Sequence, residues 1–207
     1  TIDHLALEAG GRLAVTGASG SGKSTFVNLV SGLGRPDRGR VVWRGVDIAR
    51  FSESQRDRWR GQNVGLVMQD FHLFAGLTAL DNVLLPARLA GAYGGEHKRR
   101  AHDLLSRVGL ARPDQRIETM SRGEMQRVAV ARALLRAPGV IVADEPTASL
   151  DPVNGAAIGT LLRDLARQSG ATLIVVSHDP RLIAAFPRRI ALADGMVSAD
   201  ETLSEAC

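Results

Sequence analysis

The sequence is almost without cysteine and has no long apolar run. Its 207 residues include one cysteine, Cys207 at the last position, so we expect a free thiol and no internal disulfide or thiolate metal cluster. No segment approaches the roughly 18 uninterrupted apolar residues of a membrane-spanning helix, and the first residues lack the basic-then-apolar order of a signal peptide. We therefore expect a soluble, cytoplasmic protein.

Lysine is also scarce. Lys23 and Lys98 are the only lysines among 26 basic residues, and arginine carries almost all of the net charge of +4. The basic residues are spread along the chain and form no blocks, so we expect no nucleic-acid partner. Against this background Lys23, which lies inside a glycine-rich loop, is difficult to dismiss as a generic surface residue.

The order of apolar segments predicts an α/β fold with a mostly parallel sheet. Short β-branched runs predict strands at residues 13–15, 41–43, 64–68, 140–143, 173–176 and 190–192. Amphipathic patterns predict helices at residues 23–30, 52–60, 97–108, 124–136, 153–168 and 180–185.

The interval between Asp70 and Met120 has no strong strand pattern. We therefore predict a single domain over residues 1–207, in which a core of residues 1–69 and 138–207 carries an all-helical subdomain at about residues 70–137. The glycine-rich sequence at residues 91–95 is the expected flexible joint of that subdomain.

Residues 17–24, GASGSGKS, fit the pattern G-x-x-x-x-G-K-[ST] between a predicted strand and a predicted helix. Glycine lets the backbone wrap closely around a phosphate, so that N–H groups and the positive end of the helix point at the anion. Lys23 would reach the β- and γ-phosphates, Ser24 would offer its hydroxyl to Mg²⁺, and Thr25 would contact the α-phosphate. The alternative, a glycine turn without a ligand, is disfavoured by the strand–loop–helix context. The predicted nucleotide contacts are Gly17, Ala18, Ser19, Gly20, Ser21, Gly22, Lys23, Ser24 and Thr25.

A second apolar strand ends in two adjacent carboxylates, Asp144 and Glu145. A nucleotide-bound metal needs a carboxylate partner, and hydrolysis needs a group that orients or deprotonates water. Because adjacent residues of a strand point to opposite faces, the two acids cannot share one role. We predict that Asp144 serves Mg²⁺ through water and that Glu145 is the general base. The alternative is an exposed acidic turn, which the phosphate loop disfavours.

Residues 121–134, SRGEMQRVAVARAL, resemble the signature sequence of ATP-binding-cassette (ABC) ATPases, whose commonest form is LSGGQ-x-QR followed by an alanine-rich helix. The resemblance covers essentially the whole chain. In order along the sequence, its other elements are Gln69, the strand end at Asp144 and Glu145, the SLD turn at residues 149–151, and His178. It implies a P-loop NTPase core with an inserted signature subdomain, and it implies ATP and Mg²⁺ as cofactors.

The resemblance also implies roles for single residues. Gln69 would contact Mg²⁺ and the lytic water, and His178 would contact the γ-phosphate and the catalytic carboxylate. The resemblance also places Asp151, in the SLD turn, at the nucleotide-binding site. Ser121 and Gly123 would bind the γ-phosphate of ATP held by a second chain, so the resemblance implies a dimer that closes on two ATP molecules.

The chain departs from the family pattern in two places. Met120, Arg122 and Glu124 replace Leu, Gly and Gln of the signature, whereas the serine and the second glycine are kept. Residues 1–16 contain none of the aromatic residues that usually stack on adenine, so we expect that aromatic and an N-terminal strand to be missing. Nucleotide affinity and base selectivity are affected by this second departure more than the phosphate chemistry.

The segment from Asp70 to Pro86 resembles the subgroup of lipoprotein-release, macrolide-export and cell-division ATPases. There it lines the groove that receives a helix of a membrane permease, which would hold this chain at the inner face of the cell membrane. The apolar contacts would be Phe71, Leu73, Phe74 and Leu77, unless these side chains form the core of the helical subdomain. The alternative functions are a polar amino-acid importer ATPase and a soluble ABC ATPase that acts on DNA or ribosomes.

Overall fold

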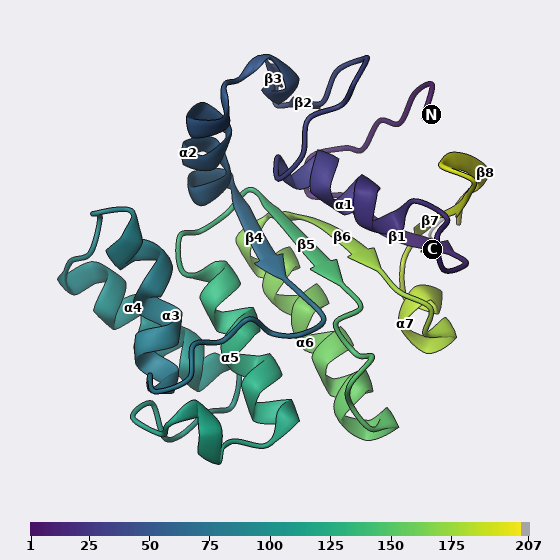
Figure 1. The fold of residues 1–207 in the computed structure, drawn as a ribbon. Coiled ribbons are helices and arrows are strands. Elements are labelled where there is room, and N and C mark those ends of the chain that lie inside the picture. Colours follow the sequence, from purple (N-terminus) through teal and green to yellow (C-terminus); the bar gives the residue numbers. More distant parts are fainter. Residues whose placement is uncertain (204–207) are drawn as a thin grey trace.

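The computed structural model describes residues 1–203, so the thiol predicted at Cys207 lies outside the described residues. A six-stranded sheet in the order β4-β5-β6-β1-β7-β8 runs through the molecule (Figure 1). Its first four neighbouring pairs are parallel and the pair β7–β8 is antiparallel. The strands are β1 (Arg12–Gly17), β4 (Val64–Val67), β5 (Val140–Asp144), β6 (Thr172–Val176), β7 (Arg188–Ala193) and β8 (Met196–Thr202).

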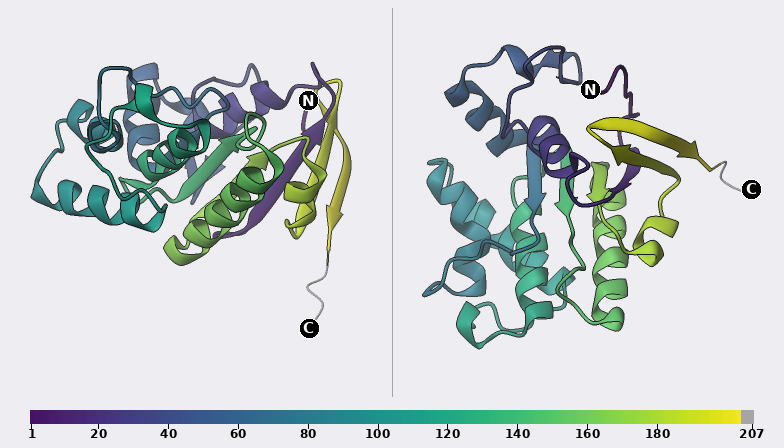
Figure 2. Two further views of the ribbon diagram at one scale, coloured as in Figure 1. Left: turned by 90° about the horizontal axis from the view of Figure 1, so that it is seen from below. Right: turned by 45° about the vertical axis from the view of Figure 1, so that its right-hand side comes forward.

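The interior strands β5 and β6 are apolar over almost their whole length because helices cover both faces of the sheet. On one face the β5 and β6 side chains pack with Phe26 and Val27 of α1. On the other face they pack with α3, α4, α5 and α6 (Figure 2). The helices are α1 (Lys23–Ser31), α2 (Glu53–Asn63), α3 (Ala79–Leu89), α4 (Gly95–Arg107), α5 (Arg122–Leu134), α6 (Pro152–Ser169) and α7 (Pro180–Ala184), with short 3-10 turns η1 (Ile48–Arg50) and η2 (Ile117–Thr119).

The α/β prediction is confirmed, and five of the six predicted strands lie in the central sheet. The strand expected at residues 41–43 is instead a two-residue strand, β2 (Val42–Trp43), which pairs with β3 (Val46–Asp47) in a separate small sheet. All six predicted helices are present, and their ends agree with the predicted ends within a few residues. The elements β3, β8 and α3 were not individually predicted.

The interval predicted to be a helical subdomain contains α3, α4, η2 and α5. Their apolar side chains share one continuous core with α6 and with the face of the sheet opposite α1. The packing alone therefore does not separate two units. The division at residues 70–137 stays a prediction. The glycine-rich joint connects α3 to α4, where the Arg88 guanidinium lies 5.2 Å from the centre of the Tyr93 ring.

Candidate functional site

Most of the predicted site residues lie at one edge of the sheet, where the parallel strands end. The register pairs Val67 of β4 with Ala143 of β5, and Asp144 with Val176 of β6. Strand β1 lies next to β6 in the same direction. Ligands of open α/β sheets bind at this carboxyl edge. The segments that follow the strands are therefore neighbours: Gln69 after β4, Glu145 after β5, His178 after β6, and the loop of residues 18–22 after β1.

The loop between β1 and α1 requires its glycines. Gly17 has φ 147°, and a Cβ there would lie 2.4 Å from the Leu192 carbonyl oxygen. Gly20 and Gly22 have φ 79° and 101°, which also favours glycine. The hydroxyl of Ser21 is buried and has no hydrogen-bond partner among the described residues. The backbone of this loop is closely packed, and the Ser21 hydroxyl inside it is available to bind a ligand.

Lys23 begins α1 and folds back over the loop. Its ammonium donates to the carbonyl oxygens of Gly17 at 2.7 Å and Ala18 at 2.8 Å. Gly22 caps the helix without a side-chain hydrogen bond, so the first N–H groups of α1 remain available to an anion. Ser24 and Thr25 are exposed on the first turn.

Asp144 ends β5 within the field of Lys23. Burial and the neighbouring Glu145 carboxylate raise the pKa of Asp144, and Lys23 opposes the increase. The carboxylate and the Ser24 hydroxyl are oxygen donors of the kind that Mg²⁺ prefers. Within residues 1–203 no group of three or more His, Cys, Asp or Glu side chains could hold a metal alone. This donor set fits an Mg²⁺ that obtains most of its ligands from phosphates and water.

Glu145 is fixed at the end of the strand. Its backbone has φ 46°, an uncommon conformation for a residue with a side chain, and its N–H donates to the Val176 carbonyl oxygen at 2.8 Å. Its Oε2 lies 2.9 Å from Nδ1 of His178 and accepts from the Ser177 hydroxyl at 3.4 Å. The Glu145 side chain is 13% exposed and the His178 side chain 73%. The Glu145 carboxylate is therefore fixed by hydrogen bonds and contacts the solvent-exposed imidazole of His178.

Comparison with known proteins agrees with this geometry. The family described as ABC transporter matches residues 2–148. A lipoprotein-releasing system ATP-binding protein, LolD, of Shewanella denitrificans is 39% identical over 96% of this chain and 86% of its own. The LolD of Oleidesulfovibrio alaskensis is 42% identical over 93% of this chain and 84% of its own. The chain belongs to the ABC transporter ATPase family.

Solved ABC cassettes share the fold. The dimeric cassette MJ0796 bound to ADP and Pi is 35% identical, with a TM-score of 0.87 over 98% of this chain and 89% of its own. The cassette cbiO1 of Clostridium perfringens, part of the cbiONQ transporter complex, is 27% identical, with a TM-score of 0.85 over 96% of this chain and 79% of its own. This ABC ATPase thus binds and hydrolyses ATP, and the roles of its individual site residues stay predictions.

The ABC signature turn lies away from the phosphate loop of the same chain. Ser121 caps α5: its hydroxyl accepts from the Glu124 N–H at 3.3 Å, and the Glu124 carboxylate accepts from the Ser121 N–H at 2.9 Å. The N–H and the hydroxyl of Ser121 both donate to the Glu124 carboxylate, at 2.9 Å each, and these two bonds lower the pKa of Glu124. Helices α5 and α1 pack on opposite faces of the sheet (Figure 1). Ser121 and Gly123 lie at the start of α5 and Lys23 at the start of α1, and these two helix starts lie apart in Figure 1.

Asp151 has a local structural contact as well as its predicted role. Its carboxylate caps α6 by accepting from the N–H groups of Val153 and Asn154 at 3.0 Å, and the Asn154 side chain is the main cause of its lowered pKa. A Cβ on Gly123 would meet Asn154 at 3.5 Å, so the cap lies beside the signature turn. A hollow of about 360 Å³ is lined by both Asp151 and His178.

The segment predicted to meet a permease is only partly exposed. Phe71 is buried at 7% exposure, as the core alternative requires, whereas Phe74 is 55% exposed. Gln69 is exposed. Within residues 1–203 the structure contains no helix that is long and apolar enough to cross a membrane.

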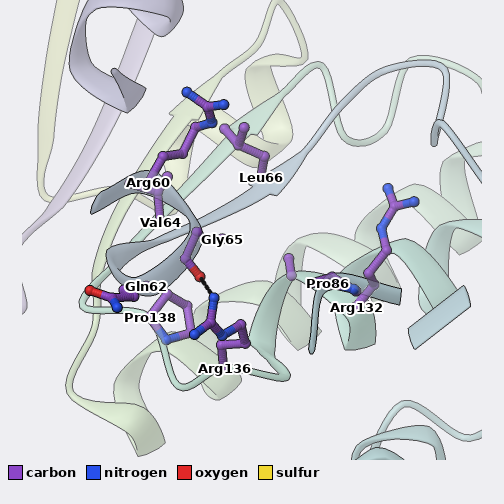
Figure 3. A pocket seen from close by; sticks show the side chains of 11 residues that line it. Arg60, Gln62, Val64, Gly65, Leu66, Pro86, Arg132, Arg136 and Pro138 are labelled. Atoms are coloured by element: carbon purple, nitrogen blue, oxygen red, sulfur yellow. Dashed lines mark hydrogen bonds between the residues drawn. The ribbon is translucent and has the colours of Figure 1, made fainter. Parts of the chain in front are cut away.

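A cavity of about 290 Å³ opens beside this segment, between α2, β4, α3 and α5 (Figure 3). Its wall contains apolar residues such as Leu66 and Pro86, and three arginines: Arg60, Arg132 and Arg136. Sequence patterns did not indicate these arginines, since Arg60 belongs to α2, Arg132 to α5 and Arg136 to the turn that follows α5. The spacing of four residues between Arg132 and Arg136 was the available signal.

Proposed function

We propose that this ABC ATPase is the ATP-hydrolysing subunit of a transporter that releases lipoproteins from a membrane. The observation that carries the proposal is the 39–42% identity to LolD proteins over more than nine-tenths of the chain. The alternatives, an amino-acid importer ATPase and a soluble ABC ATPase, have no comparable support. The proposal includes a permease that holds the chain at the inner face of the membrane.

In the proposed reaction the loop of residues 17–22 and the start of α1 bind the phosphates. Lys23 would exchange its two carbonyl contacts for contacts with phosphate oxygens. Ser24, Asp144 and Gln69 would hold Mg²⁺, which neutralises charge that develops on the phosphates. The chemistry of the donor atoms supports this assignment.

Glu145 would accept a proton from the attacking water. Three donors or potential donors already face its Oε2, namely the Ser177 hydroxyl, the His178 N–H and the His178 ring. They orient the carboxylate before a nucleotide binds. His178, whose ring is mostly exposed, would turn toward the γ-phosphate.

A second copy of the chain would complete the site. The start of α5 lies apart from the start of α1 in Figure 1, so we infer that Ser121 and Gly123 meet ATP bound at Lys23 across an interface between two chains. The N-terminus of α5 carries a partial positive charge suited to a γ-phosphate. The dimeric solved cassette supports this arrangement.

The permease would dock at the exposed part of the segment from Asp70 to Pro86 and the adjoining cavity. The apolar wall suits an amphipathic helix. Arg132 and Arg136 add positive charge, which favours a carboxylate on the docked helix, whereas Arg60 is already paired with Asp57 at 2.7 Å. Phe74 rather than Phe71 would be the aromatic contact, since Phe71 is buried.

The test uses the chain together with the membrane protein that co-purifies with it. The complex is reconstituted in vesicles that carry a lipidated protein, and release of that protein into solution is measured on addition of MgATP. We expect release with the wild-type chain and none with Glu145→Gln, which keeps the fold but lacks the base. ATP hydrolysis without release, or ATP-driven uptake of an amino acid, would contradict the proposed substrate class.

A further inference from the structure

Two consecutive residues after Gln69 have left-handed backbone conformations. Phe71 has φ 59° and His72 has φ 46°. Residues with a Cβ avoid this region, so the conformation costs free energy and persists only where the surroundings hold it. The path of the chain next to Gln69 therefore depends on what packs against residues 71 and 72.

Helix α5 holds this segment by its backbone. The Arg132 guanidinium donates to the carbonyl oxygens of Phe71 at 2.6 Å and His72 at 2.5 Å. Arg132 is largely buried, and that burial lowers its pKa. Arg132, in the second half of α5, thus fixes the backbone of residues 71 and 72.

The first residue of α5 holds the same segment by its ring. Cζ of Arg122 lies 5.4 Å from the centre of the Phe71 ring, within the range of a cation–π contact. Arg122 directly follows Ser121, and Phe71 lies two residues after Gln69. The commonest family sequence has glycine in place of Arg122, and glycine cannot make this contact. A single side-chain contact therefore connects the signature turn to the Gln69 segment.

We propose that Arg122 is a positioning residue that acts through Phe71 on Gln69. Engagement of Ser121 by the partner chain's nucleotide would then be transmitted to the catalytic segment of the same chain. The inference rests on the proposed function, since it takes Ser121 and Gln69 as site residues. Arg122 itself does not touch the nucleotide in this role.

The kinetic test compares wild type, Arg122→Met and Arg122→Lys over ranges of ATP and Mg²⁺ concentration. Methionine keeps much of the length of the side chain and removes its charge, while lysine restores the charge. We expect Arg122→Met to lower kcat about two- to fivefold, the range of an exposed cation–π contact, and to raise the Mg²⁺ concentration for half-maximal rate. Arg122→Lys should recover part of the loss. Arg99→Met, a change at an exposed arginine of α4, is the matched control.

Two further measurements decide whether the effect passes through Gln69. In a Gln69→Ala background, Arg122→Met should cause no additional loss, because residues that act in series are not additive. Amide hydrogen exchange at residues 69–72 should be faster in Arg122→Met. Additive losses, or unchanged exchange, would overturn the positioning role. A wild-type chain without ATPase activity would count against the proposed function, and the exchange result would still decide the contact.

Discussion

At the scale of single residues, the site is defined by how differently two adjacent carboxylates are treated. Asp144 is still part of β5 and is half buried, whereas Glu145 leaves the strand with a left-handed backbone and faces His178. The pKa of Asp144 is raised mainly by burial. In the absence of nucleotide the charge on Asp144 therefore destabilises the folded state, which is consistent with the proposed role of Asp144 as a partner of Mg²⁺.

This destabilising effect leads to a stability prediction. Because the pKa of Asp144 is raised in the folded protein, its unfavourable effect is absent below the unfolded-state pKa and grows as the pH rises through the folded-state pKa. Asp144→Asn should therefore raise the melting temperature of the nucleotide-free protein by a few degrees at neutral pH and by little at pH 4. The same variant should lose most of its ATPase activity if Asp144 is the Mg²⁺ partner that we propose. Calorimetry at both pH values and a phosphate-release assay would check these two effects.

Asp200 provides a control with the opposite sign. Arg188 donates two hydrogen bonds to its carboxylate, at 2.9 and 2.7 Å, and these bonds lower the pKa of Asp200. Its stabilising effect is present above the unfolded-state pKa and is lost as the pH falls. Asp200→Asn should lower the melting temperature at neutral pH. If Asp144→Asn behaved like Asp200→Asn, burial would not be the dominant influence on Asp144.

At the scale of elements, the sequence predicts buried strands better than exposed ones. β5 and β6 are continuous apolar runs, so they are visible without any knowledge of the fold. β8 is exposed over almost its whole length and alternates weakly, so its apolar pattern is faint. The turn before β8, Asp194-Gly195 with φ values of 50° and 74°, was the usable hairpin signal. The strands β2 and β3 of the small sheet have only two residues each, so the turn at Arg44 and Gly45 determines their pairing more than their apolar pattern does.

The contact between β4 and α5 gives an element-scale prediction. A Cβ added at Gly65 would lie 2.4 Å from the Ala133 carbonyl oxygen and 3.1 Å from Pro138 Cγ. Backbone atoms cannot move aside cheaply, so Gly65→Ala should lower the free energy of unfolding by about 1–3 kcal/mol. Urea unfolding followed by circular dichroism measures this change. We also expect the cavity beside β4 to deform, because Gly65 and Ala133 both line it.

Gly61→Ala is the matched control on the neighbouring helix. There the nearest atom to the new Cβ would be the end of the Arg136 side chain at 3.4 Å, which can move. Alanine is the better helix former by about 1 kcal/mol. Gly61→Ala should therefore be neutral or slightly stabilising. Equal destabilisation by both variants would show that the close approach at Gly65 is not the cause.

At the scale of the whole molecule, the sequence predicted which residues share an edge but not how α5 connects them. Motifs at the ends of parallel strands come together by topology, so the site at Lys23, Asp144, Glu145 and His178 could be foreseen. The contact of Arg122 with Phe71 could not, because it depends on the packing of a helix against an irregular loop. For the same reason the sequence did not separate Phe71, which is buried, from Phe74, which is exposed.

The opposite positions of α1 and α5 lead to a prediction about two chains. Lys23→Ala should abolish tight nucleotide binding but leave the signature turn intact. Ser121→Asp should keep an acceptor at the N-cap, lose the bond that the Ser121 hydroxyl donates to the Glu124 carboxylate, and repel a partner's γ-phosphate by its charge. Each variant alone should hydrolyse little ATP, whereas an equimolar mixture should recover activity, because a mixed dimer contains one complete site. Phosphate release from the mixture, compared with the two separate samples, measures the recovery. A mixture that forms mixed dimers by sedimentation and remains inactive would contradict a site shared between chains.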